Sequence, residues 1–399
     1  MPMPTARKFN IAVFEGDGIG PEITAPCCEL LKQACLRVTE NNPSAGIELE
    51  MNFLPAGANA FKTMGSALPS SSVDAARKAD AILLSAMGDP EVRYADGTEL
   101  TPQIDMRFEL GLYAGLRPIR SIPGVPGPLA DPRAKNIDFV LVRESIEGLF
   151  APQAPGKMMG DEQAEETLVI TRAVSEKLFE KTFALAEQRQ AQRKALGGSS
   201  NSRVTCIDKA NVFQAFAFFR KIFYEVAEQK KQTSTMAKSK NANDAEPSSL
   251  SVDHAYVDIM SLNLVTRPWE YDVMVTENMF GDILSDLGAA LIGGMGYAPS
   301  ADLGDDHAVF QPCHGTAPDI AGKGLANPTA MFLSGAMMLD WLANRHQCQA
   351  AATAANLINR SVDAAFAQGD LKTVELGGQS DLKAVHDAVT RQLSSLAVE

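Results

Sequence analysis

The sequence lacks the patterns that mark secreted, membrane-spanning and disulfide-stabilised proteins. Its six cysteines form no CxxC pair and no regular spacing, which in a chain of 399 residues is typical of reduced thiols. No stretch approaches the ~18 consecutive apolar residues of a membrane span. The opening MPMPTARKFN also lacks the apolar segment of a signal peptide. We therefore expect a cytoplasmic protein with no membrane partner.

Positive charge is also scarce. Lys and Arg number 36 against 49 Asp and Glu, which gives a net charge of -13. A chain this acidic repels phosphate backbones and anionic lipid, so nucleic acid and membrane surfaces are poor partners for it. An anionic substrate would need a local cluster of positive side chains. The length and the 45% of apolar residues suit a globular protein of two or three domains.

Short apolar runs alternate with longer helical patterns along the chain. Strands are predicted over 9–14, 80–86, 137–143, 203–207 and 271–276. Helices are predicted over 21–35 and 212–229, and the apolar stretch 330–343 indicates a buried helix. Polar segments at 194–202 and 229–251 are predicted to be surface loops. The alternation favours an α/β fold in which helices cover a sheet.

Three aspartates have the spacing or the setting of metal ligands. Asp282 and Asp286 lie four residues apart, so on a helix both carboxylates project from one face and repel each other unless a cation lies between them. Mg²⁺ and Mn²⁺ prefer oxygen ligands of this kind. Asp258 is flanked by apolar residues, which argues against simple exposure to solvent. A helix with two solvated acids is the alternative for so short a spacing.

Three arginines and a lysine are candidates for handling a dicarboxylate. Arg143 ends the predicted strand 137–143, a position that lines ligand crevices in α/β folds. Arg107 and Arg117 could add bidentate guanidinium contacts to carboxylates, although surface arginines or ion pairs are the alternative. Lys209 also follows a strand, and beside a metal and arginines it would lose its proton readily enough to act as a base. A solvated lysine at a helix start is the alternative.

A segment rich in glycine and proline at 314–328 predicts a fixed loop that a ligand can approach closely. Within it Asp319 could accept hydrogen bonds from a ribose diol and would repel a 2′-phosphate, which favours NAD over NADP. A purely structural loop is the alternative. The early GDGIG is not the G-x-G-x-x-G pattern of dinucleotide-binding folds.

Seven segments, in order along the chain, resemble the β-decarboxylating dehydrogenases, the family of isopropylmalate, isocitrate, homoisocitrate and tartrate or D-malate dehydrogenases. They are GDGIGPE (16–22), LRP (116–118), VRE (142–144), DKAN (208–211), YVD (256–258), FGDILSDL (280–287) and HGTAPDIAGKGLANP (314–328). The last two are long and specific. The chain is identified as a member of this family, closest in style to isopropylmalate dehydrogenase.

The resemblance implies a two-domain α/β fold of the isopropylmalate/isocitrate dehydrogenase type, with a central mixed sheet flanked by helices. A discontinuous cofactor-side domain would comprise 1–112 and 293–399, and a substrate and dimerisation domain would comprise 113–292. It also implies a homodimer with shared active sites, in which Lys209 and Asp258 reach into the partner's site.

The resemblance assigns roles as well. It implies NAD and Mg²⁺ or Mn²⁺ as cofactors and a hydroxy-dicarboxylate as substrate. The catalytic residues would be Lys209 and Asp258, and the metal ligands would be Asp258, Asp282 and Asp286. Substrate binding would involve Gln103, Arg107, Arg117 and Arg143. Cofactor binding would involve Asn211, His314, Gly315, Ala317, Asp319, Ile320 and Asn327.

The chain departs from the family at two positions that bear on chemistry. The resemblance implies a tyrosine as the final proton donor, seven residues after the VRE arginine. Phe150 occupies that position here and has no proton to give. A missing positioned acid typically costs about 10²–10⁴ in rate. Gln311 stands where the family usually has a glutamate near the nicotinamide.

The segment before Arg107 selects the substrate in this family, with leucines for an isopropyl group or Ser and Asn for a third carboxylate. Residues 100–106 read LTPQIDM, which places polar Gln103 beside apolar Ile104. We expect oxidative decarboxylation of a 3-substituted (2R)-malate such as 3-isopropylmalate. The alternatives are tartrate or D-malate, and isocitrate or homoisocitrate. Phe150 leaves one further alternative, a non-catalytic regulatory subunit of the same fold.

Overall fold

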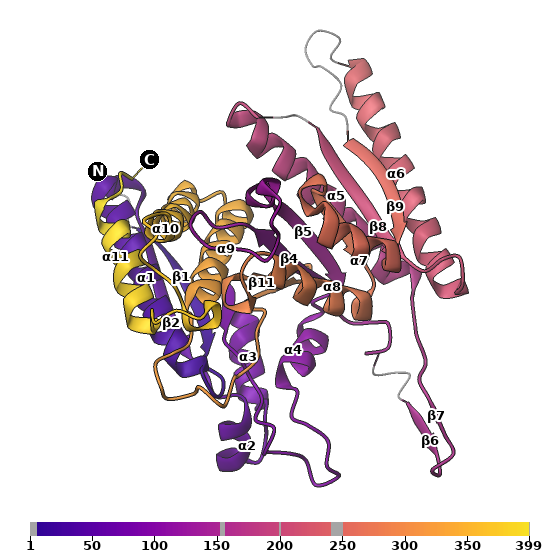
Figure 1. Ribbon diagram of the computed structural model, residues 1–399, viewed down its shortest axis with the longest axis horizontal. Coiled ribbons are helices and arrows are strands. Elements are labelled where there is room, and N and C mark those ends of the chain that lie inside the picture. Colours follow the sequence, from indigo (N-terminus) through magenta and orange to yellow (C-terminus); the bar gives the residue numbers. More distant parts are fainter. Residues whose placement is uncertain (1–5, 152–155, 199–200, 241–249, 399) are drawn as a thin grey trace. The chain divides into compact units, whose positions relative to one another are not determined.

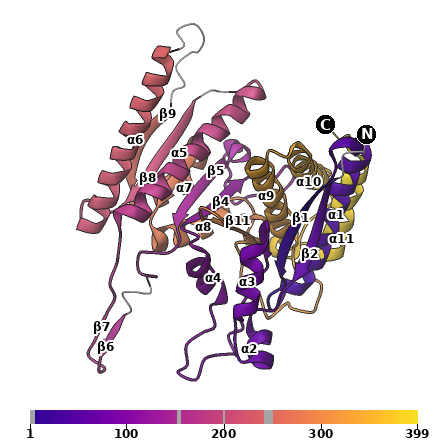
Figure 2. The same cartoon turned by 180° about the vertical axis from the view of Figure 1, so that it is seen from behind.

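The computed structural model describes residues 6–151, 156–198, 201–240 and 250–398 of the chain (Figures 1 and 2). Helices and strands alternate along most of it, and the predicted α/β fold is confirmed. Packing divides the chain into two compact units. Unit 1 comprises Met1–Leu112, Arg120–Ala130 and Ala289–Glu399, whereas unit 2 comprises Tyr113–Ile119 and Asp131–Gly288.

The strands of unit 1 form a mixed sheet in the order β2-β1-β3-β12-β11. Their bounds are β1 (Arg7–Phe14), β2 (Ile47–Phe53), β3 (Ala81–Leu84), β11 (Pro299–Leu303) and β12 (Ala308–Pro312). β1 pairs in parallel with β2 and β3, and β3 pairs in parallel with β12. β12 then pairs antiparallel with β11, which places Ser300 opposite Gln311. Helices cover this sheet, so its central strands are buried.

The helices of unit 1 come from both ends of the sequence. They are α1 (Gly20–Asn41), α2 (Ala58–Met64), α3 (Ser70–Lys78), α4 (Pro102–Leu110), α9 (Thr329–His346), α10 (Gln349–Ala367) and α11 (Leu382–Ser395), with the short 3-10 helices η1 (Pro43–Ala45), η4 (Met295–Tyr297) and η5 (Val374–Leu376). α9 is buried on most sides because it packs against strands β3, β11 and β12 and against helices α1 and α10. The buried helix predicted over 330–343 is confirmed. α11, near the C-terminus, lies beside α1 (Figure 1).

The strands of unit 2 lie in the order β4-β5-β10-β8-β9. Their bounds are β4 (Ala114–Arg120), β5 (Asp138–Glu144), β8 (Ser202–Asp208), β9 (Leu250–Tyr256) and β10 (Val273–Thr276). β10 pairs in parallel with β5 and β8, and β8 pairs in parallel with β9. Arg143 is aligned with Thr276, and Asp208 with Tyr256, so these strands end at one edge of the sheet. A separate antiparallel hairpin joins β6 (Lys157–Met159) to β7 (Gln163–Glu165).

The helices of unit 2 include one that is longer than predicted. They are α5 (Arg172–Ala195), α6 (Gln214–Lys240), α7 (Val257–Thr266) and α8 (Asn278–Leu291), with the short 3-10 helices η2 (Pro132–Asn136) and η3 (Pro268–Glu270). The prediction of a surface loop over 229–251 is therefore wrong as far as Lys240, because α6 continues to that residue. Residues 241–249 lie outside the described residues. The segment up to Lys240 contains no glycine or proline, so its polar residues continue the helix instead of ending it.

α5 and α6 pack side by side against β8 through an aromatic cluster (Figures 1 and 2). The ring of Phe179 lies 4.7 Å from Phe219 and 5.4 Å from Phe223, measured between centroids. Phe183 stacks on Phe223 at 5.5 Å. These edge and stacked contacts add to the free energy of burying large apolar rings. They anchor the two helices behind the strands whose ends carry the candidate site.

Candidate active site

Arg143 lies buried at the carboxyl end of β5 and is held from several sides. Its Nε and Nη2 donate to Asn278 Oδ1 at 2.9 and 2.7 Å, and its Nη1 pairs with Asp282 on α8. The guanidinium carbon lies 5.5 Å from the centroid of the Phe150 ring. α8 approaches so closely that a Cβ at Gly281 would lie 2.6 Å from Arg143 Cγ. The glycine of the FGD motif is thus required by this contact.

α8 carries Asp282 and Asp286 one turn apart, as their spacing predicts. Burial raises the pKa of Asp286, and repulsion from Asp282 raises it further, while Arg143 and Arg117 act in the opposite direction. A hard divalent cation between the two carboxylates would remove their repulsion. The donor chemistry of this pair therefore fits Mg²⁺ or Mn²⁺.

Lys209 and Asp258 form a second group at the ends of β8 and β9. Lys209 Nζ lies 2.7 Å from Asp258 Oδ1, and this hydrogen bond is the main reason that the pKa of Asp258 is lowered. Lys209 Nζ lies 6.0 Å from the centroid of the Tyr256 ring, and the guanidinium carbon of Arg220 lies 5.0 Å from that centroid. Arg220 pairs in turn with the buried Asp208. Arg220 and Tyr256 support Lys209; Tyr256 belongs to the YVD segment, whereas no sequence pattern marked Arg220.

The chain keeps these two groups of acids apart. Among the described residues, no three or more Asp, Glu, His or Cys side chains gather closely enough to hold a metal ion. One chain thus brings Asp282 and Asp286 together on α8 but leaves Asp258 paired with Lys209. The assigned roles of these residues stay predictions.

Three buried glutamates, Glu144, Glu147 and Glu277, lie near Arg143. Glu144 belongs to the VRE segment, but the sequence analysis gave none of the three a role. Glu144 accepts hydrogen bonds from the backbone N–H groups of Ile146 and Glu147 at 2.7 and 2.8 Å. Burial nevertheless raises the pKa of Glu144 to about 7. Glu277 accepts from the Phe280 N–H at 2.7 Å, and burial raises its pKa as well. This part of unit 2 therefore holds carboxyl groups that titrate above their usual range.

In unit 1, α4 carries Gln103 and Arg107 one turn apart. Arg107 is only 9% exposed, and its Nε donates to Asp302 Oδ2 at 3.0 Å. Nη1 and Nη2 of Arg107 make no hydrogen bond within the described part of the chain. Gln103 Oε1 is buried and likewise has no hydrogen-bond partner there. Both residues thus have polar atoms whose hydrogen-bonding capacity is unused in the described part of the chain.

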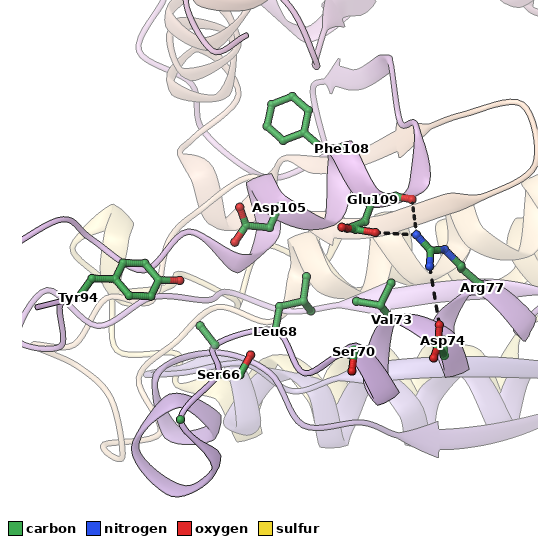
Figure 3. Close-up of a pocket in the computed structure, with 12 residues that line it drawn as sticks. Ser66, Leu68, Ser70, Val73, Asp74, Arg77, Tyr94, Asp105, Phe108 and Glu109 are labelled. Carbon is green, nitrogen blue, oxygen red and sulfur yellow. Dashed lines mark hydrogen bonds and ion pairs between the residues drawn. The ribbon is translucent and has the colours of Figure 1, made fainter. Parts of the chain in front are cut away.

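The opposite face of α4 lines a cavity of roughly 460 Å³ (Figure 3). Figure 3 shows Tyr94, Asp105 and Phe108 around this space. Arg77 Nη2 donates to Glu109 at 2.6 Å at one end of it, which ties α3 to α4. The cavity contains none of the predicted site residues.

The loop at 314–328 is pinned to α1. Glu22 accepts hydrogen bonds from the backbone N–H of Gly322 and, at 2.9 Å, from that of Gly324. Lys323 Nζ donates to the backbone oxygen of Asp319 at 2.6 Å, and the Asp319 side chain is exposed. The loop is thus fixed by its backbone, and it presents the Asp319 carboxylate to solvent. Glu22 was missed as a support for this loop because its partners lie 300 residues away.

The remaining predicted cofactor residues differ in what they offer. Gly315, Ala317 and Ile320 lie in the same loop, with Ala317 at a φ of 40°, whereas Asn211 follows β8 in unit 2. His314 Nε2 is buried without a hydrogen-bond partner in the described ranges. Burial lowers the pKa of His314, so the ring is neutral near pH 7.

Asn327 is already engaged inside its loop. Its Nδ2 donates to Glu375 Oε1 at 2.6 Å, and its Oδ1 accepts from the Thr329 hydroxyl at 2.7 Å. Its predicted contact with a cofactor would have to compete with these two bonds. His314 therefore offers a cofactor more unsatisfied hydrogen-bonding capacity than Asn327 does.

Comparisons with known proteins agree with this arrangement. The family described as isocitrate/isopropylmalate dehydrogenase matches residues 10–393. The 3-isopropylmalate/3-methylmalate dehydrogenase of Methanocaldococcus jannaschii is 34% identical over 385 residues, which are 96% of this chain and 98% of that protein. The homoisocitrate dehydrogenase of the same organism is 36% identical over 379 residues, or 93% and 96% of the two chains.

A solved structure extends the likeness to three dimensions. The isocitrate dehydrogenase of Methylococcus capsulatus matches with a TM-score of 0.77 and 30% identity, covering 96% of this chain and 99% of that one. The chain therefore belongs to the isocitrate/isopropylmalate dehydrogenase family, and it is an oxidoreductase of the β-decarboxylating type. Members of this family generally use NAD and a divalent metal ion. None of the described helices has the length and apolarity needed to cross a membrane.

Proposed function

We propose that this enzyme catalyses the NAD-dependent and divalent-metal-dependent oxidative decarboxylation of a 3-substituted (2R)-malate, with 3-isopropylmalate as the first candidate. The observation that carries the proposal is the close grouping of Arg143, Asp282 and Asp286 at the end of β5. It combines a guanidinium for a carboxylate with two oxygen ligands for a cation. The names of relatives that act on 3-isopropylmalate support the choice of substrate.

The arginines would hold the two substrate carboxylates. Arg143 is fixed by Asn278, so its guanidinium direction is set before a substrate arrives. Arg107 is fixed through its Nε and keeps Nη1 and Nη2 for a bidentate contact. Such fixed donors lower the entropy cost of orienting a small dicarboxylate.

Lys209 would take the proton from the C2 hydroxyl. Its Nζ is held in place by Asp258 Oδ1 at 2.7 Å. A divalent ion held by Asp258 together with Asp282 and Asp286 would supply electron withdrawal at the substrate oxygens. Lys209 would act as the general base and accept the hydroxyl proton at Nζ.

The loop at 314–328 would receive NAD. Glu22 fixes the loop backbone, His314 offers a neutral ring nitrogen, and exposed Asp319 can accept hydrogen bonds from a ribose diol.

All six cysteines are free thiols, which supports a reducing compartment such as the cytoplasm.

A homodimer with shared sites is part of the proposal. Apolar side chains are exposed on α7 and α8 of unit 2, close in sequence to Asp258 and Asp282. They are Ile259, Leu262, Val265, Met279 and Ile283, with exposures between 36% and 58%. Apolar side chains exposed in this number on neighbouring helices are typical of surfaces that a partner covers. A second copy seated there would supply the missing third carboxylate.

Tartrate or D-malate is the second candidate substrate class. The unpaired, buried Oε1 of Gln103 favours a C3 substituent that donates a hydrogen bond, such as the hydroxyl of tartrate. An isopropyl group would leave this oxygen without a partner. The residue thus favours a more polar substrate than a leucine at the same place would.

A substrate panel tests the proposal. Purified protein with NAD and Mg²⁺ or Mn²⁺ would be assayed for NADH and CO₂ with 3-isopropylmalate, 3-methylmalate, D-malate, tartrate, isocitrate and homoisocitrate. Turnover on 3-isopropylmalate or 3-methylmalate, lost in Asp286→Asn, supports the first candidate. Preference for tartrate or D-malate selects the second. No turnover on any member with either metal contradicts both and favours a non-catalytic subunit.

A further inference from the structure

Asp302 is a buried carboxylate at which three elements of unit 1 meet. It lies in β11 and is only 1% exposed. Its Oδ2 accepts a hydrogen bond from Arg107 Nε of α4 at 3.0 Å and another from Gln311 Nε2 of β12 at 2.7 Å. No feature of the sequence marked Asp302, and Arg107 lies 195 residues away along the chain.

A carboxylate in this setting restricts the directions of Arg107 and Gln311. An ionised carboxylate only accepts hydrogen bonds, so Gln311 must turn its Nε2 toward Asp302 and its Oε1 away. Arg107 uses Nε for the same oxygen, so its Nη1 and Nη2 edge points elsewhere. That edge makes no hydrogen bond within the described part of the chain. The direction of both side chains therefore depends on one atom.

We infer that Asp302 is a positioning residue that orients the Arg107 donors toward a substrate carboxylate and the Gln311 carbonyl toward an amide donor of the cofactor. The inference rests on the proposed function, because Arg107 and Gln311 are taken to face substrate and nicotinamide. It deepens that function, because one buried charge then couples the two binding sites. Asp302 touches neither ligand and acts through Arg107 and Gln311.

Gln311 and Asp302 form a matched pair. A glutamate at position 311 would bring a second carboxylate to within about 2.7 Å of the first, where two like charges repel strongly. One acid and one amide avoid this repulsion. The same balance would be kept if the acid and the amide exchanged places, as in Asp302→Asn combined with Gln311→Glu. In that double variant the introduced asparagine would offer its oxygen to Arg107 and its amide hydrogens to the introduced glutamate.

The test compares Asp302→Asn, the exchanged double variant and Asp363→Asn with the wild type. Asp363 pairs with Arg120 in the same unit at 2.8 Å, but it lies outside the candidate site, so it controls for loss of an ion pair alone. For Asp302→Asn we expect KM for the substrate to rise about tenfold or more, since a charge-assisted hydrogen bond is lost, with kcat changing by less than about threefold. The double variant should return KM to within about threefold of wild type, and Asp363→Asn should leave KM unchanged.

A second readout does not depend on turnover. The measured quantity is the rate at which the Nε–H proton of Arg107 exchanges with water, with its signal assigned by its loss in Arg107→Lys. This exchange should be slow in the wild type and at least about tenfold faster in Asp302→Asn. An inactive wild type with this exchange behaviour would contradict the proposed function but keep the orienting role of Asp302. An unchanged exchange rate overturns that role. The role is also overturned if Asp302→Asn, like Asp363→Asn, lowers only the thermal stability and leaves KM unchanged.

Asp302→Asn alone could fail to fold, and two further variants cover that outcome. The double variant keeps the buried charge and decides by itself whether the substrate KM depends on it. A substrate KM more than about tenfold above wild type contradicts the inference.

Gln311→Leu removes only the amide, so Arg107 keeps its bond to Asp302. It should raise KM for NAD about fivefold with less than about twofold change in KM for the substrate. A rise in the substrate KM alone would contradict the assignment of Gln311 to the cofactor side.

Discussion

The centroid of the Phe150 ring lies 5.5 Å from the guanidinium carbon of Arg143, at the position where the family resemblance places a proton-donating tyrosine. Arg143 is already held by Asn278 and Asp282, so the ring adds a cation–π contact to a fixed guanidinium. The ring therefore keeps the place of the tyrosine beside Arg143, but it lacks the hydroxyl. A final proton would have to come from water or from another group.

Phe150→Tyr should restore a positioned acid. We expect the rate of CO₂ release to rise by at least about tenfold, since a positioned general acid contributes about 10²–10⁴ in rate. Single-turnover measurements of NADH and CO₂ would separate oxidation from decarboxylation. Phe53→Tyr, on the exposed end of β2, is the matched control and should change neither rate. An equal or lower rate in Phe150→Tyr would show that another proton donor already serves the reaction.

Mixed dimers test whether the site is shared. Lys209→Met and Asp282→Asn should each abolish turnover, because one removes the proposed base and the other a proposed metal ligand. If the two residues act in one site from different chains, random mixing of the two variants should restore about one quarter of wild-type activity. Refolded or co-expressed mixtures would be assayed against each parent. Activity no higher than that of the parents would place Lys209 and Asp282 in the same chain's site.

Asp319 should select NAD over NADP. Replacing it by serine removes a carboxylate that would repel a 2′-phosphate, so the ratio of kcat/KM for NAD to that for NADP should fall by at least about tenfold. Asp306→Ser, also exposed in unit 1, is the control and should keep the wild-type ratio. A wild type that uses both cofactors equally would disprove the assignment before any variant is made.

Glu144 should make the protein less stable as the pH rises. Its pKa is about 7 in the folded protein because of burial, against an ordinary 4.5, so between these values the folded state holds a proton that the unfolded state has released. Stability from this group is present below pH 4.5 and is lost as the pH rises to about 7, by on the order of 2–3 kcal/mol.

Urea unfolding at about pH 5, 6, 7 and 8 would measure this loss. Glu144→Gln should flatten the decline, whereas Glu40→Gln on the exposed side of α1 should not. Parallel curves for wild type and Glu144→Gln would show that the carboxyl is not protonated in the fold.

Local features of the fold and of the site were predictable from sequence. The four-residue spacing of Asp282 and Asp286 requires only a helix, and α8 provides it. The end of an apolar run placed Arg143 at the edge of a parallel sheet. The apolar run at 330–343 needed a buried helix, because no face of it suits water.

Contacts between distant segments had no such signal. Asp302 of β11 contacts Gln311 of the paired strand β12 and Arg107 of α4, 195 residues away, and no periodicity in the sequence encodes either contact. Arg220 supports Lys209 through the Tyr256 ring, which comes from another strand. α6 was predicted too short because polar residues carry no apolar period, although nothing in them ends a helix.

The division of the chain into a discontinuous and a nearly continuous unit has a consequence for its synthesis on the ribosome. Asp131–Gly288 can begin to pack as soon as it emerges, whereas β3 pairs with β12 of the last third of the chain. At about 5–20 residues per second, the ribosome reaches the end of β12 at Pro312 roughly 1 to 5 seconds after Gly288. During that interval the apolar edge of β3 at Ile82 and Leu83 stays unpaired, so the nascent chain should be a substrate for chaperones until β12 has emerged.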